Sequence, residues 1–262
     1  MRIALFDLDH TLLPHDTQAL FCNYVLKREP WRLLLHLLFL PFALLRAAGL
    51  ASTATAKRAF HSYLWGMRVE KLRLYARQFA GECVDSWMYP ELRAELMRHR
   101  HQGRVTILNT ASPSFYARAI AEQWEFDHWI ATEVVLGERV PFMPRLDGSN
   151  NKHGVKIATM ESRLPQLKNR SAADQKDSWG YSDSPADIPL LEYCGHKILI
   201  HPGRRLSAHF AQDPLAVSLQ PGRPSRTKRS PAIPIATARA PSATPTSGGP
   251  PRRIASRRAR CS

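Results

Sequence analysis

Short apolar runs alternate with helical segments over most of the chain, and this alternation restricts the possible folds more than any other feature. The predicted strands are residues 3–6, 105–109, 128–131 with a continuation over 134–136, 178–182 and 197–201. The helices predicted between and after them are residues 90–100, 114–124, 153–163, 187–194 and 204–210. Parallel strands need long crossover connections, which are usually helical. The sequence therefore predicts an α/β fold, with a parallel sheet that carries helices on both faces.

An all-helical stretch interrupts the alternation directly after the first strand. Residues 17–27 and 52–88 have apolar side chains at helical spacing. We therefore expect residues 15–89 to form an inserted helical cap, and residues 1–14 and 90–215 to form the core. Residues 216–262 are expected to be a disordered tail, basic and rich in proline and arginine.

The formal net charge of +15 is concentrated at the end of the chain. Ten of the 37 lysine and arginine residues follow Gln220, and no aspartate or glutamate does. This tail could touch anionic lipid or nucleic acid, but its composition favours a solvated tail, so we expect no specific nucleic-acid partner. The oligomeric state is left open.

The four cysteines suggest a reducing compartment. Cys22, Cys83, Cys194 and Cys261 form no CxxC pair and no metal-like spacing, so reduced thiols in a cytoplasmic protein are expected. The N-terminus begins with a strand-like run and carries no signal-peptide pattern.

The segment 31–50 contains a nearly continuous apolar run, Leu33 to Leu45. Thirteen helical residues span roughly 20 Å, too little to cross a bilayer. A buried core helix, an interfacial or re-entrant membrane segment and a partner-binding helix all fit the run. The flanking Arg32 and Arg46, together with Pro41, favour contact with a membrane surface, at the inner face if the protein is cytoplasmic.

Polar residues follow several predicted strands, at the sheet edge where ligands of open parallel sheets bind. They are Asp7 and Asp9 after the first strand, Thr110 and Ser112 after the second, Lys156 near a helix start, and Asp183 and Asp187 after "SWGYS". Each alone is a weak signal. Together, in this order, they indicate an active site.

The four motifs FDLDHT, ILNT, the lysine of GSNNKHGVK, and YSDSPAD resemble those of the haloacid dehalogenase-like (HAD) phosphatases, over about residues 1–215. The position of the insertion resembles the C1-capped IB branch, which contains phosphoserine phosphatase. The apolar cap run resembles the bacterial phosphatidylglycerophosphatase C group. Two departures stand out: His10 replaces a common glycine, and "NNKHGVK" leaves Lys152 as a competitor of Lys156 for the motif lysine.

The resemblance implies a Rossmann-like HAD fold and an aspartyl-phosphate mechanism, with which the chemistry of the residues agrees. Asp7 would attack phosphorus, and Asp9 would protonate the leaving group and later activate water. A cation is needed to hold the two carboxylates together. Mg²⁺ suits Asp7, the Asp9 backbone carbonyl and Asp183, with Asp187 in support of the metal or of the lysine.

The remaining candidates would bind the phosphate. Thr110 would donate a hydrogen bond to it, and Lys156 would neutralise charge near Asp7. Ser112 is a phosphate ligand or, more in keeping with "TASP", a helix cap. Asn150 and Asn151 read as turn residues.

These observations predict a Mg²⁺-dependent phosphomonoester phosphatase. The apolar cap favours a lipid phosphate such as phosphatidylglycerophosphate, and a soluble metabolite such as phosphoserine is the alternative. A non-catalytic membrane-binding or nucleic-acid-binding protein would not need five intact motif residues.

Overall fold

A single parallel sheet organises the chain. The computed structural model describes residues 1–84, 86–222 and 224, within the compact unit Met1–Arg226. Six parallel strands lie in the order β3-β2-β1-β4-β5-β6. They are β1 (Ile3–Phe6), β2 (Val105–Pro113), β3 (His128–Thr132), β4 (Trp179–Ser182), β5 (His196–Ile200) and β6 (Ala216–Leu219). The predicted α/β architecture is confirmed.

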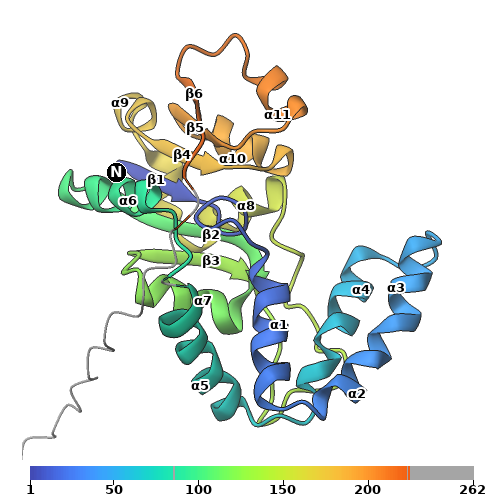
Figure 1. The fold of residues 1–262 in the computed structure, drawn as a ribbon. Coiled ribbons are helices and arrows are strands. Elements are labelled where there is room, and N and C mark those ends of the chain that lie inside the picture. The colour runs from blue at the N-terminus through green and yellow to red at the C-terminus, as the bar shows by residue number, and fades with distance from the viewer. Residues whose placement is uncertain (85, 223, 225–262) are drawn as a thin grey trace, which may run out of the picture. The chain divides into compact units, whose positions relative to one another are not determined.

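Helices cover both faces of this sheet (Figure 1). The alternation of side chains along β1 explains this arrangement. Ile3 and Leu5 pack with residues of α8 (Gly154–Arg163) and α10 (Ile188–Glu192) in one core cluster. Ala4 and Phe6 point to the opposite face, into a second cluster with α6 (Pro90–His101) and α7 (Ser114–Gln123). Both faces of the strand are therefore buried, which accounts for its uninterrupted apolar sequence.

The inserted segment is all-helical, as predicted (Figure 1). Its helices are α1 (Thr17–Arg28), α2 (Arg32–His36), α3 (Leu40–Ala47), α4 (Thr53–Phe60) and α5 (Val69–Phe79). The helical stretch expected over 52–88 is not continuous. It is divided by a 3₁₀ turn at His61–Leu64 and by Gly66, whose positive φ of 73° ends the regular helix. After α5 the chain makes a π-helical turn at Ala80–Val84.

The connection between β3 and α8 contacts the cap. The Val140 amide donates to the Met67 carbonyl at 2.9 Å, and the Gly66 amide donates back to the Val140 carbonyl at 2.9 Å. The Val69 amide adds a third bond, to the Glu138 carbonyl at 3.0 Å. The strand expected over 134–136 is not formed: this part makes only an isolated antiparallel bridge between Val134 and Leu146. The connection contacts the cap further along, through the backbone of Glu138 and Val140.

The apolar segment 31–50 does not form a buried helix. It is broken into α2, a 3₁₀ turn at Leu37–Phe39, and α3, and most of its large side chains are exposed. The exposed ones are Trp31, Leu33, Leu34, Leu37, Leu38, Leu40, Leu44, Leu45 and Leu50, here named the leucine patch. Within the described residues, no helix is long and apolar enough to cross a bilayer.

Arg32 does not flank this patch, contrary to the sequence interpretation. Its side chain is buried, and its guanidinium pairs with Glu29 at 2.9 Å and donates to the carbonyls of Tyr63 and Trp65. Arg32 therefore joins three parts of the cap, because a buried guanidinium needs several acceptors. Arg46 remains exposed beside the patch.

The core extends further than predicted. Residues 216–219, assigned to the tail, form the edge strand β6, whose backbone pairs with β5 from Lys197↔Ala216 to Ile200↔Leu219. The short helices α9 (Ala172–Lys176) and α11 (Arg204–His209) complete the described elements. The predicted basic tail otherwise lies almost wholly outside the described residues.

Candidate active site

All seven residues predicted for the site line one cavity of about 420 Å³ at the carboxyl ends of the central strands. They are Asp7, Asp9, Thr110, Ser112, Lys156, Asp183 and Asp187. Asp7 directly follows β1, and Asp183 directly follows the neighbouring β4. The cap completes the cavity with Phe39, Ala56, Lys57 and Phe60, among others.

Lys156 forms the charged centre of the site. Its Nζ lies 2.6 Å from Asp7 Oδ1 and 2.7 Å from Asp187 Oδ2, and its side chain is only 2% exposed. Burial alone would lower the pKa of Lys156, but the two carboxylates raise it, so the lysine stays charged. Lys152, its competitor from the sequence, is exposed. The geometry thus favours Lys156 as the motif lysine, which α8 directs into the core at its third position.

Asp7 is a buried carboxylate whose charged partner is Lys156. Burial raises the pKa of Asp7 to about 7, while the charge of Lys156 opposes the rise. A carboxyl group whose pKa is raised by burial in this way needs more positive charge nearby to be fully ionised at neutral pH. The site is therefore suited to receive a further cation.

Asp9 is held in a different environment from Asp7. Its Oδ1 accepts from the Thr17 amide, at the start of α1, at 2.7 Å, and its Oδ2 accepts from the Ser112 hydroxyl at 2.5 Å. Burial raises the pKa of Asp9, and these hydrogen bonds lower it in part. A raised pKa favours the protonated form that a general acid needs.

Thr11 connects the carboxylates of β1 and β4. Its hydroxyl lies 3.3 Å from Asp7 Oδ2 and 3.0 Å from Asp183 Oδ1, and can donate to one of them at a time. It also accepts from the Asp183 amide at 3.0 Å. Thr11 is the last residue of the FDLDHT motif, but no role for it was predicted from the sequence.

The donor set fits Mg²⁺. Asp7 and Asp183 offer hard oxygen ligands on adjacent strands, and burial raises the pKa of both, as expected of carboxylates that lack sufficient positive charge. Among the described residues, no three Asp, Glu, His or Cys side chains group as a metal site by themselves. Two carboxylates and a backbone carbonyl do not require such a group. Asp187 Oδ2 accepts from Lys156 and from the Ser182 hydroxyl, which favours its role in support of the lysine.

Ser112 does not cap the following helix. Helix α7 begins at Ser114 after Pro113, with no side-chain cap, and the Ser112 hydroxyl donates to Asp9 instead. The Thr110 hydroxyl accepts from the Ser112 amide at 3.0 Å and is buried at the cavity wall. The expected phosphate contact by Ser112 stays a prediction, because its one hydroxyl proton is directed at Asp9.

Two asparagines assigned to a turn also support the site. Asn151 Nδ2 donates to Asn109 Oδ1 at 2.9 Å and to the Thr110 carbonyl at 2.8 Å, so it fixes the end of β2 against the start of α8. Asn150 Oδ1 accepts from Lys57 of the cap at 2.9 Å and from Thr132 of β3 at 3.1 Å. Their partners lie at least 18 residues away, so local turn statistics could not find them.

His10 occupies a backbone position that favours glycine. Its φ of 59° lies in the left-handed region, which non-glycine residues adopt at a cost of about 1–2 kcal/mol. This explains why a glycine is common at this position in similar motifs, and why its replacement is unusual.

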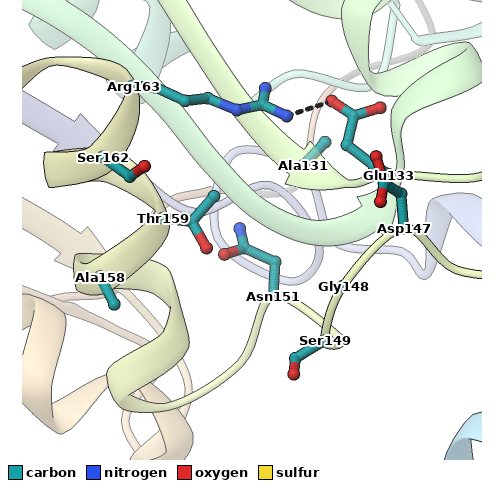
Figure 2. Close-up of a pocket in the computed structure, with 10 residues that line it drawn as sticks. All are labelled: Ala131, Glu133, Asp147, Gly148, Ser149, Asn151, Ala158, Thr159, Ser162 and Arg163. Carbon is teal, nitrogen blue, oxygen red and sulfur yellow. Dashed lines mark hydrogen bonds and ion pairs between the residues drawn. The ribbon is translucent and has the colours of Figure 1, made fainter.

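A second cavity of about 400 Å³ lies on another side of α8 (Figure 2). Its charged residues include Arg163 and Glu133, which pair with each other at 2.5 Å. None of the catalytic candidates lines it. The catalytic candidates are therefore gathered in the cavity between cap and core.

The site combines a carboxylate pair, a buried lysine and hard oxygen donors at the carboxyl edge of a parallel sheet, which defines an enzyme of phosphoryl transfer. The chain belongs to the haloacid dehalogenase-like hydrolase family, whose sequence profile matches residues 4–192. Its relatives agree with the expected phosphatase class.

Two of three curated relatives are named as phosphatases. The "Inhibition of morphological differentiation protein" of Streptomyces azureus is 23% identical over 206 residues, covering 78% of this chain and 73% of the relative. Phosphoserine phosphatase SerB1 of Mycobacterium tuberculosis is 26% identical over 207 residues, covering 78% and 66%. Histidinol-phosphatase of Neisseria meningitidis is 20% identical over 222 residues, covering 78% and 92%.

Solved structures confirm the fold. A protein of unknown function from Bordetella pertussis matches with a TM-score of 0.66 at 23% identity, covering 82% of this chain and 97% of that one. A phospho-aspartyl intermediate analogue of phosphoserine phosphatase matches with a TM-score of 0.56 at 15% identity, covering 85% and 94%. The predicted HAD-like fold with a helical insertion is thus shared with these proteins.

Proposed function

We propose that this phosphatase hydrolyses phosphomonoesters through an aspartyl-phosphate on Asp7 and depends on Mg²⁺. The pairing of Asp7 with the buried Lys156, beside Asp9, is the observation that carries the proposal. Bound Mg²⁺ would offset the negative charge shared by Asp7, the phosphate and Asp183. Asp7, the Asp9 backbone carbonyl and Asp183 would hold it.

The first step forms the covalent intermediate. A carboxylate oxygen of Asp7 attacks phosphorus while the bond from phosphorus to the ester oxygen breaks. Asp9, in its protonated form, gives its proton to the departing oxygen, so the leaving group departs as an alcohol. Lys156 and Thr110 stabilise the charge on the phosphoryl oxygens.

The second step regenerates the enzyme. Asp9, now ionised, takes a proton from a water molecule as that water attacks phosphorus. The bond between phosphorus and the Asp7 oxygen breaks, and inorganic phosphate leaves. Ser112 and the Thr17 amide keep the Asp9 carboxylate oriented in both steps.

Two measurements test this chemistry. Acid-quenched wild-type protein should retain substrate-derived phosphate as a hydroxylamine-sensitive adduct, and Asp7→Asn should neither form the adduct nor turn over. Mg²⁺ should raise the melting temperature of wild type and leave that of Asp183→Asn unchanged, since a ligand stabilises only a state that binds it. Lys168→Gln, an exposed lysine outside the cavity, is the control. Full turnover in excess EDTA, or by a folded Asp7→Asn protein, would refute the proposal.

We propose that the substrate is a lipid phosphate of the phosphatidylglycerophosphate type. The leucine patch would bind the membrane surface in which this lipid lies. The patch exposes nine large apolar side chains near a cavity that Phe39 and Phe60 line. Exposed apolar surface of this kind marks contact sites with partners or membranes. A soluble metabolite gives no reason for the patch, although the relatives include phosphatases named for histidinol phosphate and phosphoserine.

Comparison of substrates tests this choice. Turnover of phosphatidylglycerophosphate in mixed micelles should exceed that of phosphoserine and histidinol phosphate in kcat/KM by more than tenfold. Higher kcat/KM with either soluble ester would remove the lipid proposal and leave the phosphatase chemistry intact.

A further inference from the structure

Two lysines of the active-site cavity have no part in the proposed chemistry. Lys57 projects from α4 of the cap, and Lys152 lies in the connection that precedes α8. Both line the cavity that contains Asp7. Lys156, by contrast, is already paired with two carboxylates.

Lys57 is held in place without a counter-charge. Its Nζ donates to the Ala111 carbonyl at 2.5 Å and to Asn150 Oδ1 at 2.9 Å. Within the described part of the chain, neither Lys57 nor Lys152 forms an ion pair with a carboxylate. An ammonium group has three donors, so Lys57 keeps one N–H beyond the two that fix its position.

The electrostatics of this pair favour an incoming anion. Burial, and after it the positive charge of Lys152, lower the pKa of Lys57 to about 8, although the charges of Asp9 and Asp16 oppose the shift. A half-buried cation next to a second cation is destabilised by desolvation and by repulsion between like charges. An anion bound by both would relieve both effects.

The surroundings indicate which part of a substrate would reach the lysines. The proposed function puts the reacting phosphate at Asp7 and Lys156, and Lys57, which pairs with neither Asp7 nor Asp187, is then left for the alcohol portion. Phe39 and Phe60 line the same cavity, with ring centroids 5.4 Å apart. The alcohol portion therefore meets both cationic and apolar groups.

We propose that Lys57 and Lys152 form a second anion site, which binds a phosphodiester or carboxylate on the alcohol portion of the phosphomonoester substrate. This inference rests on the proposed function, since it places the scissile phosphate at Asp7. It narrows the substrate class to monoesters that carry a second negative charge.

Three esters with the same propyl skeleton test the site. Their far ends carry a neutral hydroxyl, a carboxylate or a methyl phosphodiester. Wild type should hydrolyse at least one charged ester with kcat/KM about tenfold or more above the neutral one, and the better of the two identifies the anion. Lys152→Gln, which removes an exposed charge, and Lys57→Gln, which keeps a donor for Ala111 and Asn150, should each reduce that preference. Lys168→Gln should retain it.

The outcomes separate the two proposals. Equal kcat/KM for all three esters in wild type, or a preference that survives in the Lys57→Gln, Lys152→Gln double variant, would overturn the second anion site while the phosphatase proposal stands. Hydrolysis of none of the esters, with Mg²⁺ present, would overturn both. A loss in Lys57→Gln that is equal for charged and neutral esters would show a purely structural role for Lys57.

Discussion

Replacing Lys156 with methionine should destabilise the protein strongly, because it leaves buried carboxylates without their cation. Lys156 is 2% exposed and lies within 2.7 Å of both Asp7 and Asp187, whose side chains are 10% and 3% exposed. Loss of one partner from a buried ion pair costs about 3–5 kcal/mol. Methionine is flexible and can fill much of the vacated space, so most of the loss should be electrostatic.

The pH dependence of this loss in stability distinguishes an electrostatic cause from a packing cause. Burial already raises the pKa of Asp7 to about 7 with Lys156 present, against about 3.9 in an unfolded chain. Without Lys156 the folded-state pKa is higher still. A group with a raised folded-state pKa loses its stabilising contribution as the pH rises through that pKa. The deficit of Lys156→Met should therefore be largest above about pH 8 and smaller at pH 5.5.

Urea unfolding in EDTA, followed by circular dichroism at pH 5.5 and 8.5, measures the effect. Adding Asp7→Asn to Lys156→Met removes one of the buried carboxylates that have lost their cation. The double variant should therefore recover part of the free energy of unfolding at pH 8.5. Lys168→Met, at an exposed position, should stay within about 0.5 kcal/mol of wild type. A Lys156→Met protein within 1 kcal/mol of wild type at pH 8.5, or no recovery in the double variant, would refute this reasoning.

Three further changes have distinct readouts. Thr11→Val removes the hydroxyl between the two metal-site carboxylates and should weaken the Mg²⁺-induced rise in melting temperature, with an apparent Kd about tenfold higher. Ser112→Ala removes a hydrogen bond that lowers the pKa of Asp9, so kcat should fall and its alkaline limb should move to higher pH. Leu34→Asp with Leu44→Asp, at side chains 70% and 71% exposed, should abolish co-sedimentation with anionic liposomes without lowering the melting temperature.

Matched controls accompany these changes. Thr53→Val, at an exposed cavity position without contact to the carboxylates, should leave the Mg²⁺ effect unaltered. Leu74→Asp, at a 44% exposed leucine of α5 outside the patch, should leave liposome binding intact. Wild-type protein that fails to co-sediment would end the membrane proposal, and an unchanged alkaline limb in Ser112→Ala would contradict the assigned role of Asp9.

The periodic pattern was sufficient to predict five of the six strands and the place of the candidate site. Strand and helix periodicities are local and can be recognised in the sequence. The rule that ligands bind at the carboxyl ends of parallel strands then predicted that Asp7 and Asp183 are neighbours, although 176 positions separate them in sequence. The edge strand β6 escaped prediction because it is only four residues long and its place in the sheet depends on pairing with β5.

Contacts between distant segments could not be predicted. In the sequence Arg32 flanks the apolar run, yet in the structure its side chain is buried and donates to carbonyl groups about 30 residues later. Ser112 reads as a helix cap, yet its partner is Asp9, which precedes it by 103 residues. In both cases the local sequence fits a plausible surface or cap role, and only tertiary packing supplies the stronger partner.

The contact between the cap and the β3–α8 connection limits how this enzyme could be recombined. Residues 15–89 resemble an excisable module, but Val140, from outside them, is 1% exposed and exchanges two backbone hydrogen bonds with Gly66 and Met67. A chimera that exchanged residues 15–89 alone would replace the segment that pairs with Val140. The buried backbone amide and carbonyl of Val140 would then lack their hydrogen-bond partners. Exchange of specificity between related enzymes would thus require two segments, 15–89 and 134–146, to be transplanted together.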